Sequence, residues 1–174
     1  MIKADKPLLG FAAFSGTGKT TLLTRLLPVL TSCGLRVGMI KHSHHRFEVD
    51  IPGKDSYELR KAGAAQMLLT SKHRWALMVD KVAEQEPELQ QELERLDQST
   101  LDLILVEGFR HEAFPKIELH RPSLNKPLLC VDDDNIIAIA TDGELAQSID
   151  LPQLDINDVQ GVADFVQSYF SAEI

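Results

Sequence analysis

Hydrophobic and polar positions along this chain follow two alternating patterns. Short continuous apolar runs are typical of buried strands in a parallel sheet, whereas apolar positions three and four residues apart are typical of helices. The first run covers residues 8–12 and predicts a strand. A helical pattern follows, with an apolar face made of Leu22, Leu23, Leu26, Leu27 and Leu30. Gly34 is placed to cap this helix, and residues 35–40 predict the second strand.

The middle of the chain carries weaker patterns. A polar loop is expected at residues 41–53. Asp55 and Glu58 then have the spacing of a capping box, which predicts a short helix that ends at Gly63. Residues 67–70 and 75–79 predict a β-hairpin, and residues 84–96 predict a charged surface helix.

The last part returns to strong patterns. Residues 101–106 predict a buried strand, residues 117–120 and 136–140 two further strands, and residues 159–170 a closing helix capped by Asn157 or Asp158. The alternation predicts an α/β fold, with a mainly parallel twisted sheet flanked by helices and an additional β-hairpin. With 174 residues, the chain fits one domain that spans residues 1–174.

The most informative stretch is residues 13–20, Ala-Phe-Ser-Gly-Thr-Gly-Lys-Thr, between the first strand and the first helix. This is the arrangement of a P-loop, in which glycines let successive backbone N–H groups point at phosphate oxygens. Lys19 adds positive charge near the β- and γ-phosphates, and the Thr20 hydroxyl is a ligand for Mg²⁺. The motif predicts a P-loop nucleotide-binding domain whose phosphates contact Ser15, Gly16, Thr17, Gly18, Lys19, Thr20 and Thr21. The alternative is a glycine-rich turn without a ligand.

One position departs from the usual P-loop pattern. Its first glycine is replaced by Ala13. We expect this position to need a small side chain rather than a positive φ, so the substitution leaves the interpretation in place.

An acidic residue ends the most apolar strand. Glu107 follows residues 101–106, and the carboxyl ends of parallel strands are where such folds bind ligands. Glu107 is therefore a candidate catalytic residue, together with Lys19, and with Thr20 a candidate ligand of Mg²⁺. Gly108 would bring its N–H near the γ-phosphate. The alternative is a strand-terminal acid that faces solvent.

Lys41 and His42 follow the second strand and so share this edge of the sheet. We interpret both as lining the nucleotide or partner cleft. Two further histidines, His44 and His45, leave a transition-metal site or a solvated polar loop as alternatives.

Two arginines are further candidates for binding an anion. Arg60, in the predicted short helix, and Arg110, just after Glu107, could each clamp a phosphate, or could be ordinary surface arginines.

Recognition of the base is the least defined part. The guanine-reading pattern Asn-Lys-x-Asp is absent, because residues 125–128 place Leu128 where the acid belongs. Asp142, after the predicted strand 136–140, could bind the N1–H and 2-amino groups of guanine, or could be a turn residue. The pattern alone does not separate GTP from ATP.

Composition and charge exclude some classes. The net charge of −8 argues against general nucleic-acid binding, which needs a basic surface. No stretch is apolar and long enough for a membrane span, the N-terminus lacks a signal-peptide core, and the two cysteines lie far apart, so we expect a cytoplasmic protein.

Together the P-loop, the Lys41-His42 loop, the Gly-Lys-Asp-Ser segment at residues 53–56 and residues 101–109 resemble the bacterial molybdopterin-guanine dinucleotide biosynthesis protein B family, over nearly the whole chain. The resemblance implies a homodimeric GTP-binding protein with weak GTPase activity. It also implies an accessory role beside the guanylyltransferase that joins GMP to molybdopterin. Other molybdenum cofactor enzymes are a further class of partner. By this match, residues 16–20 hold the phosphates and Glu107 is the acidic partner.

Two classes of function therefore compete. One is an adapter that holds GTP for a partner, and we favour it. The other is a small-molecule kinase or a metal-insertion GTPase, which would call for an acceptor pocket and lid, or for a stronger Cys/His signal. We expect the dimer to form through the strands after Ile117.

Overall fold

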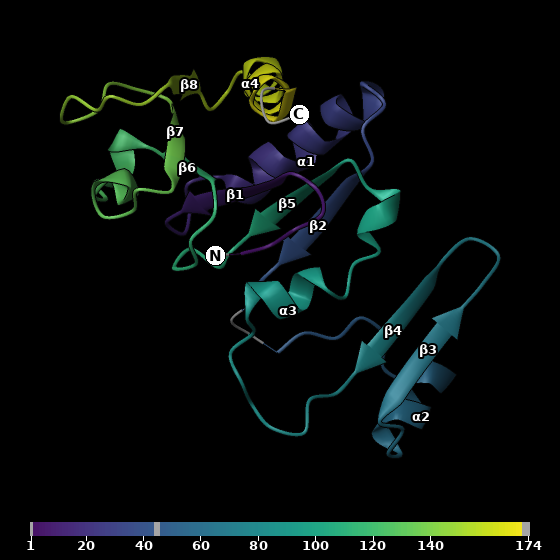
Figure 1. Ribbon diagram of the computed structural model, residues 1–174. Helices are drawn as coiled ribbons and strands as arrows, with labels where there is room; N and C mark the ends of the chain where they lie inside the picture. Colours follow the sequence, from purple (N-terminus) through teal and green to yellow (C-terminus); the bar gives the residue numbers. More distant parts are fainter. Residues whose placement is uncertain (1, 44–45, 172–174) are drawn as a thin grey trace. The chain divides into compact units, whose positions relative to one another are not determined.

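A parallel sheet of six strands forms the centre of the larger of two compact units (Figure 1). The computed structural model describes residues 2–43 and 46–171. The first unit consists of Met1–His42 and Pro87–Ile174, and the second of Ser43–Glu86.

The six strands lie in the order β2-β5-β1-β6-β7-β8, and every neighbouring pair is parallel. Their bounds are β1 Leu8–Ala13, β2 Val37–Lys41, β5 Leu103–Glu107, β6 Lys116–His120, β7 Ile136–Thr141 and β8 Gln153–Asp155. The expected fold class is confirmed, and so are five of these strands within a few residues. The short edge strand β8 was not foreseen, because three residues carry almost no periodic signal.

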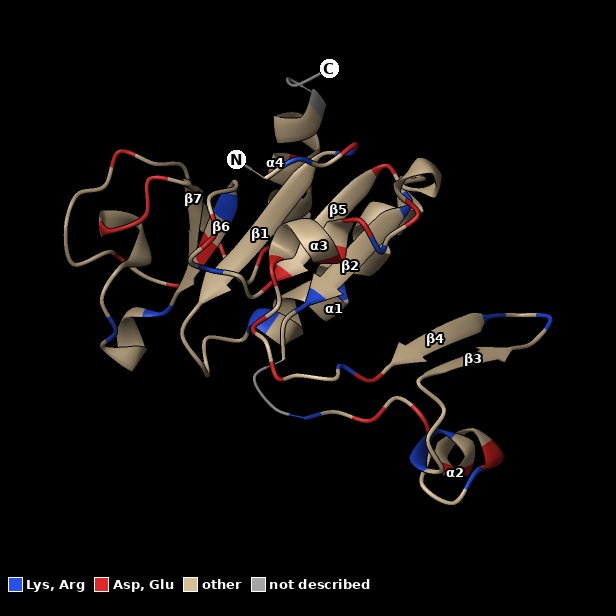
Figure 2. Cartoon of the chain, turned by 60° about the horizontal axis from the view of Figure 1, so that its bottom comes forward, with Lys and Arg blue, Asp and Glu red and all other residues tan. Residues whose placement is uncertain are grey.

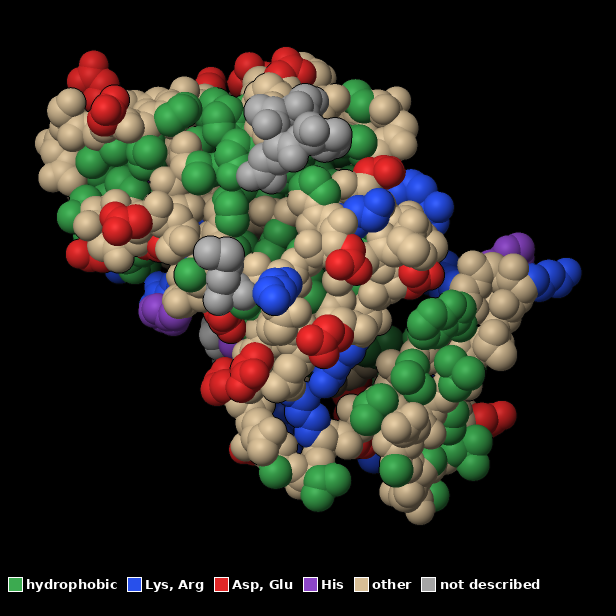
Figure 3. Space-filling model, viewed as in Figure 1, with side chains coloured by type: hydrophobic (Ala, Val, Ile, Leu, Met, Phe, Trp, Pro, Cys, Tyr) green, Lys and Arg blue, Asp and Glu red, His purple; other side chains and the backbone are tan. Residues whose placement is uncertain are grey.

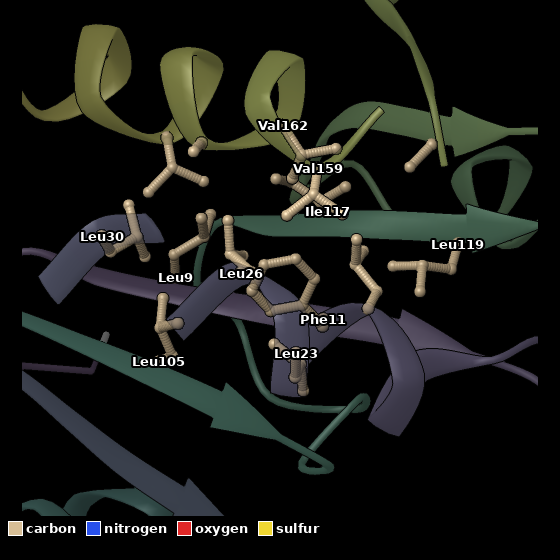
Figure 4. Packing of buried hydrophobic residues seen from close by; sticks show 14 of the residues in the cluster. Leu9, Phe11, Leu23, Leu26, Leu30, Leu105, Ile117, Leu119, Val159 and Val162 are labelled. Carbon is tan, nitrogen blue, oxygen red and sulfur yellow. The ribbon is translucent and has the colours of Figure 1, made fainter. Parts of the chain in front are cut away.

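Helices cover both faces of this sheet. The amphipathic helices α1 (Lys19–Ser32) and α4 (Val159–Ser171) pack on one face. Leu26 of α1 and Val162 of α4 are both fully buried against strand residues such as Phe11 (Figure 4). Asp158 caps α4 as expected, since its carboxylate accepts a hydrogen bond from Gly161 N–H at 3.1 Å.

The opposite face holds the short helix α3 (Leu89–Leu93) over Ile104 and Val106. The expected surface helix at residues 84–96 was wrong in both length and exposure. Pro87 disfavours helical backbone at the residue before it, and Leu89 and Leu93 are fully buried. Three 3₁₀ turns complete this unit: η1 (Gln98–Thr100), η2 (Pro122–Leu124) and η3 (Leu129–Val131).

The second unit contains helix α2 (Asp55–Lys61) and the antiparallel hairpin of β3 (Gln66–Thr70) and β4 (Trp75–Val79). The hairpin and the helix end at Gly63, where φ is +117°, are confirmed. The capping box is not: Lys54 is the N-cap residue, and Asp55 is the first helical residue. The first turn of α2 carries Asp55 and Glu58 and its last turn Arg60 and Lys61, as the helix dipole favours, and Figure 2 colours these acidic and basic positions red and blue.

The pairing of the strands bears on the expected dimer contact. Strands β6 and β7 are each paired on both sides, so neither offers an edge for pairing with a second chain. Among the strands after Ile117 the free edge belongs to β8, so the expected dimer contact through this region would involve β8 and stays a prediction. Across the part of the chain that the structure describes, no helix has the length and apolar character needed to span a bilayer.

Candidate functional site

The loop between β1 and α1 has the backbone of an anion-binding loop. Gly16 and Gly18 have φ values of +84° and +97°, in the left-handed region that favours glycine. Gly18 is the N-cap residue of α1, whose first turn carries no acidic side chain. A Cβ placed on Gly16 would meet no atom within 4 Å. The loop thus presents open backbone at the positive end of a 14-residue helix, which is the requirement for binding phosphate.

The residues around these glycines have different surroundings. Ser15, Thr20 and Thr21 are exposed, so their side chains are accessible to a ligand. Thr17 is buried instead, and its hydroxyl donates a hydrogen bond to Phe14 O at 2.8 Å, so its side chain braces the loop. Ala13 pairs in register with Leu119 as ordinary strand, which explains why this position tolerates a Cβ.

Glu107 brings the two predicted lysines together. β5 lies between β1 and β2, and in this register Glu107 is aligned with Lys41. The distance from Lys41 Nζ to Glu107 Oε2 is 3.0 Å, and that from Lys19 Nζ to Glu107 Oε1 is 3.7 Å. The carboxylate of Glu107 therefore lies between two ammonium groups at the carboxyl edge of the sheet.

This environment changes the acidity of Lys19. Partial burial lowers the pKa of the Lys19 ammonium below its usual value, the charge of Glu107 opposes that effect, and the charges of Lys41 and Arg110 add to it. A partly desolvated cation next to further cations gains more from a bound anion than an exposed lysine does.

Gly108 and His42 are brought together by close packing. Gly108 has a φ of +103°, and a Cβ on it would lie 2.6 Å from the Cβ of His42. His42 N–H donates to Glu107 O at 2.8 Å, and the His42 ring lies 4.9 Å from that of Phe109. Glycine is thus required here by the contact between the ends of β2 and β5, and the predicted γ-phosphate contact stays a prediction.

Arg121 was not singled out in the sequence, and the structure places it at this edge. Its Nε donates to Thr17 O of the loop at 2.8 Å, and its Nη1 forms an ion pair with Asp142. Both residues follow strand ends, Arg121 after β6 and Asp142 after β7. The position directly after a strand, which pointed to Glu107 and Lys41, would also have pointed to Arg121.

A hollow of about 450 Å³ lies next to Asp142. It is lined by residues 141–144, by β8 and by Asn157. Its volume is in the range of small-molecule sites, and it opens at the same carboxyl edge as the loop.

Arg60 belongs to the second unit, where its side chain is 6% exposed. Its Nη2 donates to Asp50 Oδ1 at 2.8 Å, and it also pairs with Glu48 and Asp80. The hydrogen bond that Arg60 donates to Asp50 is the main reason why the pKa of Arg60 is raised above its usual value. Through these carboxylates Arg60 connects residues 48–50 with Asp80 inside the second unit. Its predicted contact with the nucleotide stays a prediction.

The remaining candidates are more exposed. Arg110 is exposed, and its Nε lies 3.2 Å from Nε2 of His111. His44 and His45 lie outside the described residues. Among residues 2–43 and 46–171, the structure contains no group of three or more His, Cys, Asp or Glu side chains arranged to hold a metal ion.

Comparison with known proteins gives a consistent family match. The family model described as "MobB: Molybdopterin guanine dinucleotide synthesis protein B" matches residues 8–142. The chain is 54% identical over 168 residues to the molybdopterin-guanine dinucleotide biosynthesis adapter protein of Escherichia coli (strain K12), covering 96% of this chain and 95% of the relative. It is 43% identical to the protein with the same name from Haemophilus influenzae, covering 94% and 89%.

Solved structures agree with this match. A crystal structure of molybdopterin-guanine biosynthesis protein B superposes with a TM-score of 0.72 at 26% identity, covering 94% of this chain and 99% of the other. The crystal structure of Bacillus subtilis MobB also gives 0.72 at 26% identity, covering 94% and 98%.

Proposed function

The chain belongs to the molybdopterin-guanine dinucleotide synthesis protein B (MobB) family, and on this basis we propose that it is an adapter protein of molybdopterin-guanine dinucleotide biosynthesis that binds GTP. The observation that carries the proposal is the cluster of Lys19, Glu107 and Lys41 beside a glycine loop with left-handed backbone. This arrangement supplies positive charge and N–H donors where a triphosphate needs them.

The residues present fit a triphosphate with Mg²⁺. Gly16 and Gly18 expose the N–H groups of the loop, and Lys19 is partly desolvated, so its charge is weakly screened. Thr20 and Glu107 would provide oxygen ligands for Mg²⁺, which would neutralise part of the phosphate charge. Lys41, which pairs with the other Glu107 oxygen, would hold this carboxylate in place.

We expect hydrolysis of GTP to be slow. Both carboxylate oxygens of Glu107 are already engaged in ion pairs with lysines. Neither an arginine finger nor a glutamine that positions water could be identified in the sequence, and such groups are worth about 10³-fold or more. A weak GTPase fits an adapter that presents nucleotide better than an enzyme that turns it over.

The proposed partner is the guanylyltransferase that joins GMP to molybdopterin. Holding GTP next to the partner's active site would raise its local concentration without new chemistry in this chain. The exposed Arg110, next to the triphosphate site, is the side chain that we expect to contact the transferase.

The adapter proposal is tested with molybdopterin, GTP, Mg²⁺ and limiting guanylyltransferase, with and without this chain. We expect the chain to raise the yield of the dinucleotide and to form none alone. Lys19→Ala should lose most of the GTP affinity and most of the stimulation, and Arg25→Ala, at an exposed arginine on α1, is the control. Formation of dinucleotide by the chain alone would show an enzyme, and the absence of any stimulation would contradict the proposal.

We also propose that the chain forms a homodimer through the β3–β4 hairpin. Strand alternation places Leu68, Trp75, Leu77 and Val79 on one face, and each is at least half exposed. Figure 3 shows hydrophobic side chains gathered over this unit. An exposed apolar hairpin face with unpaired edges favours self-association.

A further inference from the structure

We propose that Arg121 is a positioning residue of the nucleotide site, which holds Asp142 at the base pocket and the phosphate loop at the same time. In this view, the hollow at the ends of β7 and β8 receives a purine base with a 6-oxo and a 2-amino group. The inference rests on the proposed binding of GTP, and it identifies the residues that select the base.

The first step is that Arg121 stands on a firmly anchored segment. The chain between β6 and β7 makes no α-helix over residues 121–135, so its position depends on side chains of β6. The buried carboxylate of Glu118 accepts hydrogen bonds from Leu129 N–H at 2.8 Å and from Cys130 N–H at 2.9 Å. The fully buried Lys116 pairs with Asp133 at 2.9 Å. The later part of the connection is thereby fixed to the sheet, and Arg121 at its beginning directly follows β6.

The second step is that this connection contacts both halves of the candidate site. Toward the phosphates, Arg121 Nε donates to Thr17 O at 2.8 Å, and Lys126 Nζ lies 5.9 Å from the ring centre of Phe14. Toward the base, Arg121 pairs with Asp142, and Pro122 lies 3.5 Å from the position of a Cβ on Gly143. Arg121 therefore couples the position of the phosphate loop to that of Asp142.

The third step is the chemistry of Asp142. Its Oδ2 accepts from Arg121, and an ionised carboxylate offers about four acceptor positions, so acceptors remain for a ligand. Guanine offers N1–H and a 2-amino group side by side, which match the two oxygens of a carboxylate. Asp142 lines the hollow of about 450 Å³, so a base there would lie within its reach. The planar guanidinium of Arg121 also favours stacking on an aromatic ring.

The test measures binding of GTP, ITP, XTP and inorganic tripolyphosphate to the full chain by calorimetry with Mg²⁺. Wild type should prefer GTP to ITP, which lacks the 2-amino group. Asp142→Asn should lower the affinity for GTP by about tenfold or more. The same variant should bind XTP more tightly than GTP, because the 2-oxo group of XTP accepts a hydrogen bond from an amide. Binding of tripolyphosphate should change by no more than about twofold, since it lacks a base.

Arg121→Gln should lower the GTP preference over ITP, and Arg121→Lys should restore part of it. The effects of Arg121→Gln and Asp142→Asn should be non-additive in a double-mutant cycle. Arg95→Gln, which removes the Arg95–Glu92 pair of the same unit, is the matched control and should change no preference.

Each outcome bears on one proposal or the other. If Arg121→Gln lowers the affinities for GTP, ITP and tripolyphosphate by the same factor, Arg121 is only a structural support and the inference is wrong. If tripolyphosphate binds and requires Lys19 but GTP binds no better, the base pocket fails while the phosphate site stands. If neither ligand binds wild type, the proposed function fails and the inference fails with it.

Discussion

At the scale of single residues, Glu107 is the carboxylate that pairs with both lysines of the site. Glu107→Gln removes the negative charge between Lys19 and Lys41 while keeping the side-chain volume. We expect GTP hydrolysis to fall by about tenfold or more while GTP binding changes less, because the lost acid acts on Mg²⁺ and water rather than on the base. Single-turnover hydrolysis and calorimetry of the same samples separate the two effects. Hydrolysis at the parental rate would exclude a catalytic role for Glu107.

The pKa of Lys19 leads to a prediction about pH. Burial lowers the pKa of free Lys19 below 10.5, and a bound triphosphate would raise it again. Binding strength is therefore full below the free-state pKa of Lys19 and falls as the pH rises through it, beginning at a lower pH than for an ordinary lysine. We expect the GTP affinity of wild type to decline as the pH rises toward 10.5, before an ordinary lysine loses its charge.

The reference for this measurement is Lys19→Ala in the same buffers, since any titration of GTP itself affects both proteins equally. The GTP affinity of wild type divided by that of Lys19→Ala should decrease with rising pH. A constant ratio over this range would show that the titration of Lys19 is not coupled to nucleotide binding.

At the scale of elements, β6 is the strand whose sequence and structure differ most from a simple apolar core strand. Ile117 and Leu119 face the helices, but Lys116, Glu118 and His120 on the other face are also buried. The ammonium of Lys116 is satisfied by Glu112 O at 2.6 Å, Arg110 O at 3.3 Å and Asp133 at 2.9 Å. These bonds satisfy a charged group on a strand face that is usually apolar in a parallel sheet.

Lys116→Met should therefore destabilise the chain by about 1–3 kcal/mol, because it leaves Asp133 and the carbonyls of Arg110 and Glu112 without the donor that Lys116 buries among them. Urea unfolding followed by far-UV circular dichroism measures this, and Lys126→Met, at an exposed lysine of the same connection, should change the stability by less than about 0.5 kcal/mol. Equal stability of both variants would contradict the structural role given to Lys116.

The sequence predicted those parts of the site that depend on local rules. A glycine loop between strand and helix, and an acid at a strand end, follow from the chain within a few residues of each motif. Arg121 and Asp142 form their pair across two strands, and Arg60 meets Asp50, Glu48 and Asp80 through a fold of the second unit. Such pairs depend on tertiary contacts that no spacing along the chain encodes.

At the scale of the whole molecule, the exposed face of the hairpin predicts self-association. We expect light scattering to give twice the chain mass of 19.4 kDa, and Leu68→Asp with Leu77→Asp to give the monomer, because burying two carboxylates in the interface is costly. The single tryptophan, Trp75, lies on this face, so its emission should shift to the red in the double variant.

Leu59→Asp is the matched control. Leu59 is 59% exposed, like Leu68, but lies on α2 rather than on the hairpin. It should leave the dimer intact. A monomeric wild type over a wide concentration range would exclude this interface.

The order of the strands has a consequence for how the chain matures on the ribosome. β1 is made first, yet its two neighbours are β5 and β6, and Leu8 pairs with Ile104. At typical rates of synthesis, β1 and the glycine loop wait roughly 5–20 s for their first partner strand. During this delay the apolar β1 has no neighbour to pair with, which makes the nascent chain a candidate for protection by chaperones. The nucleotide site is thus among the first segments to be translated and among the last to be completed.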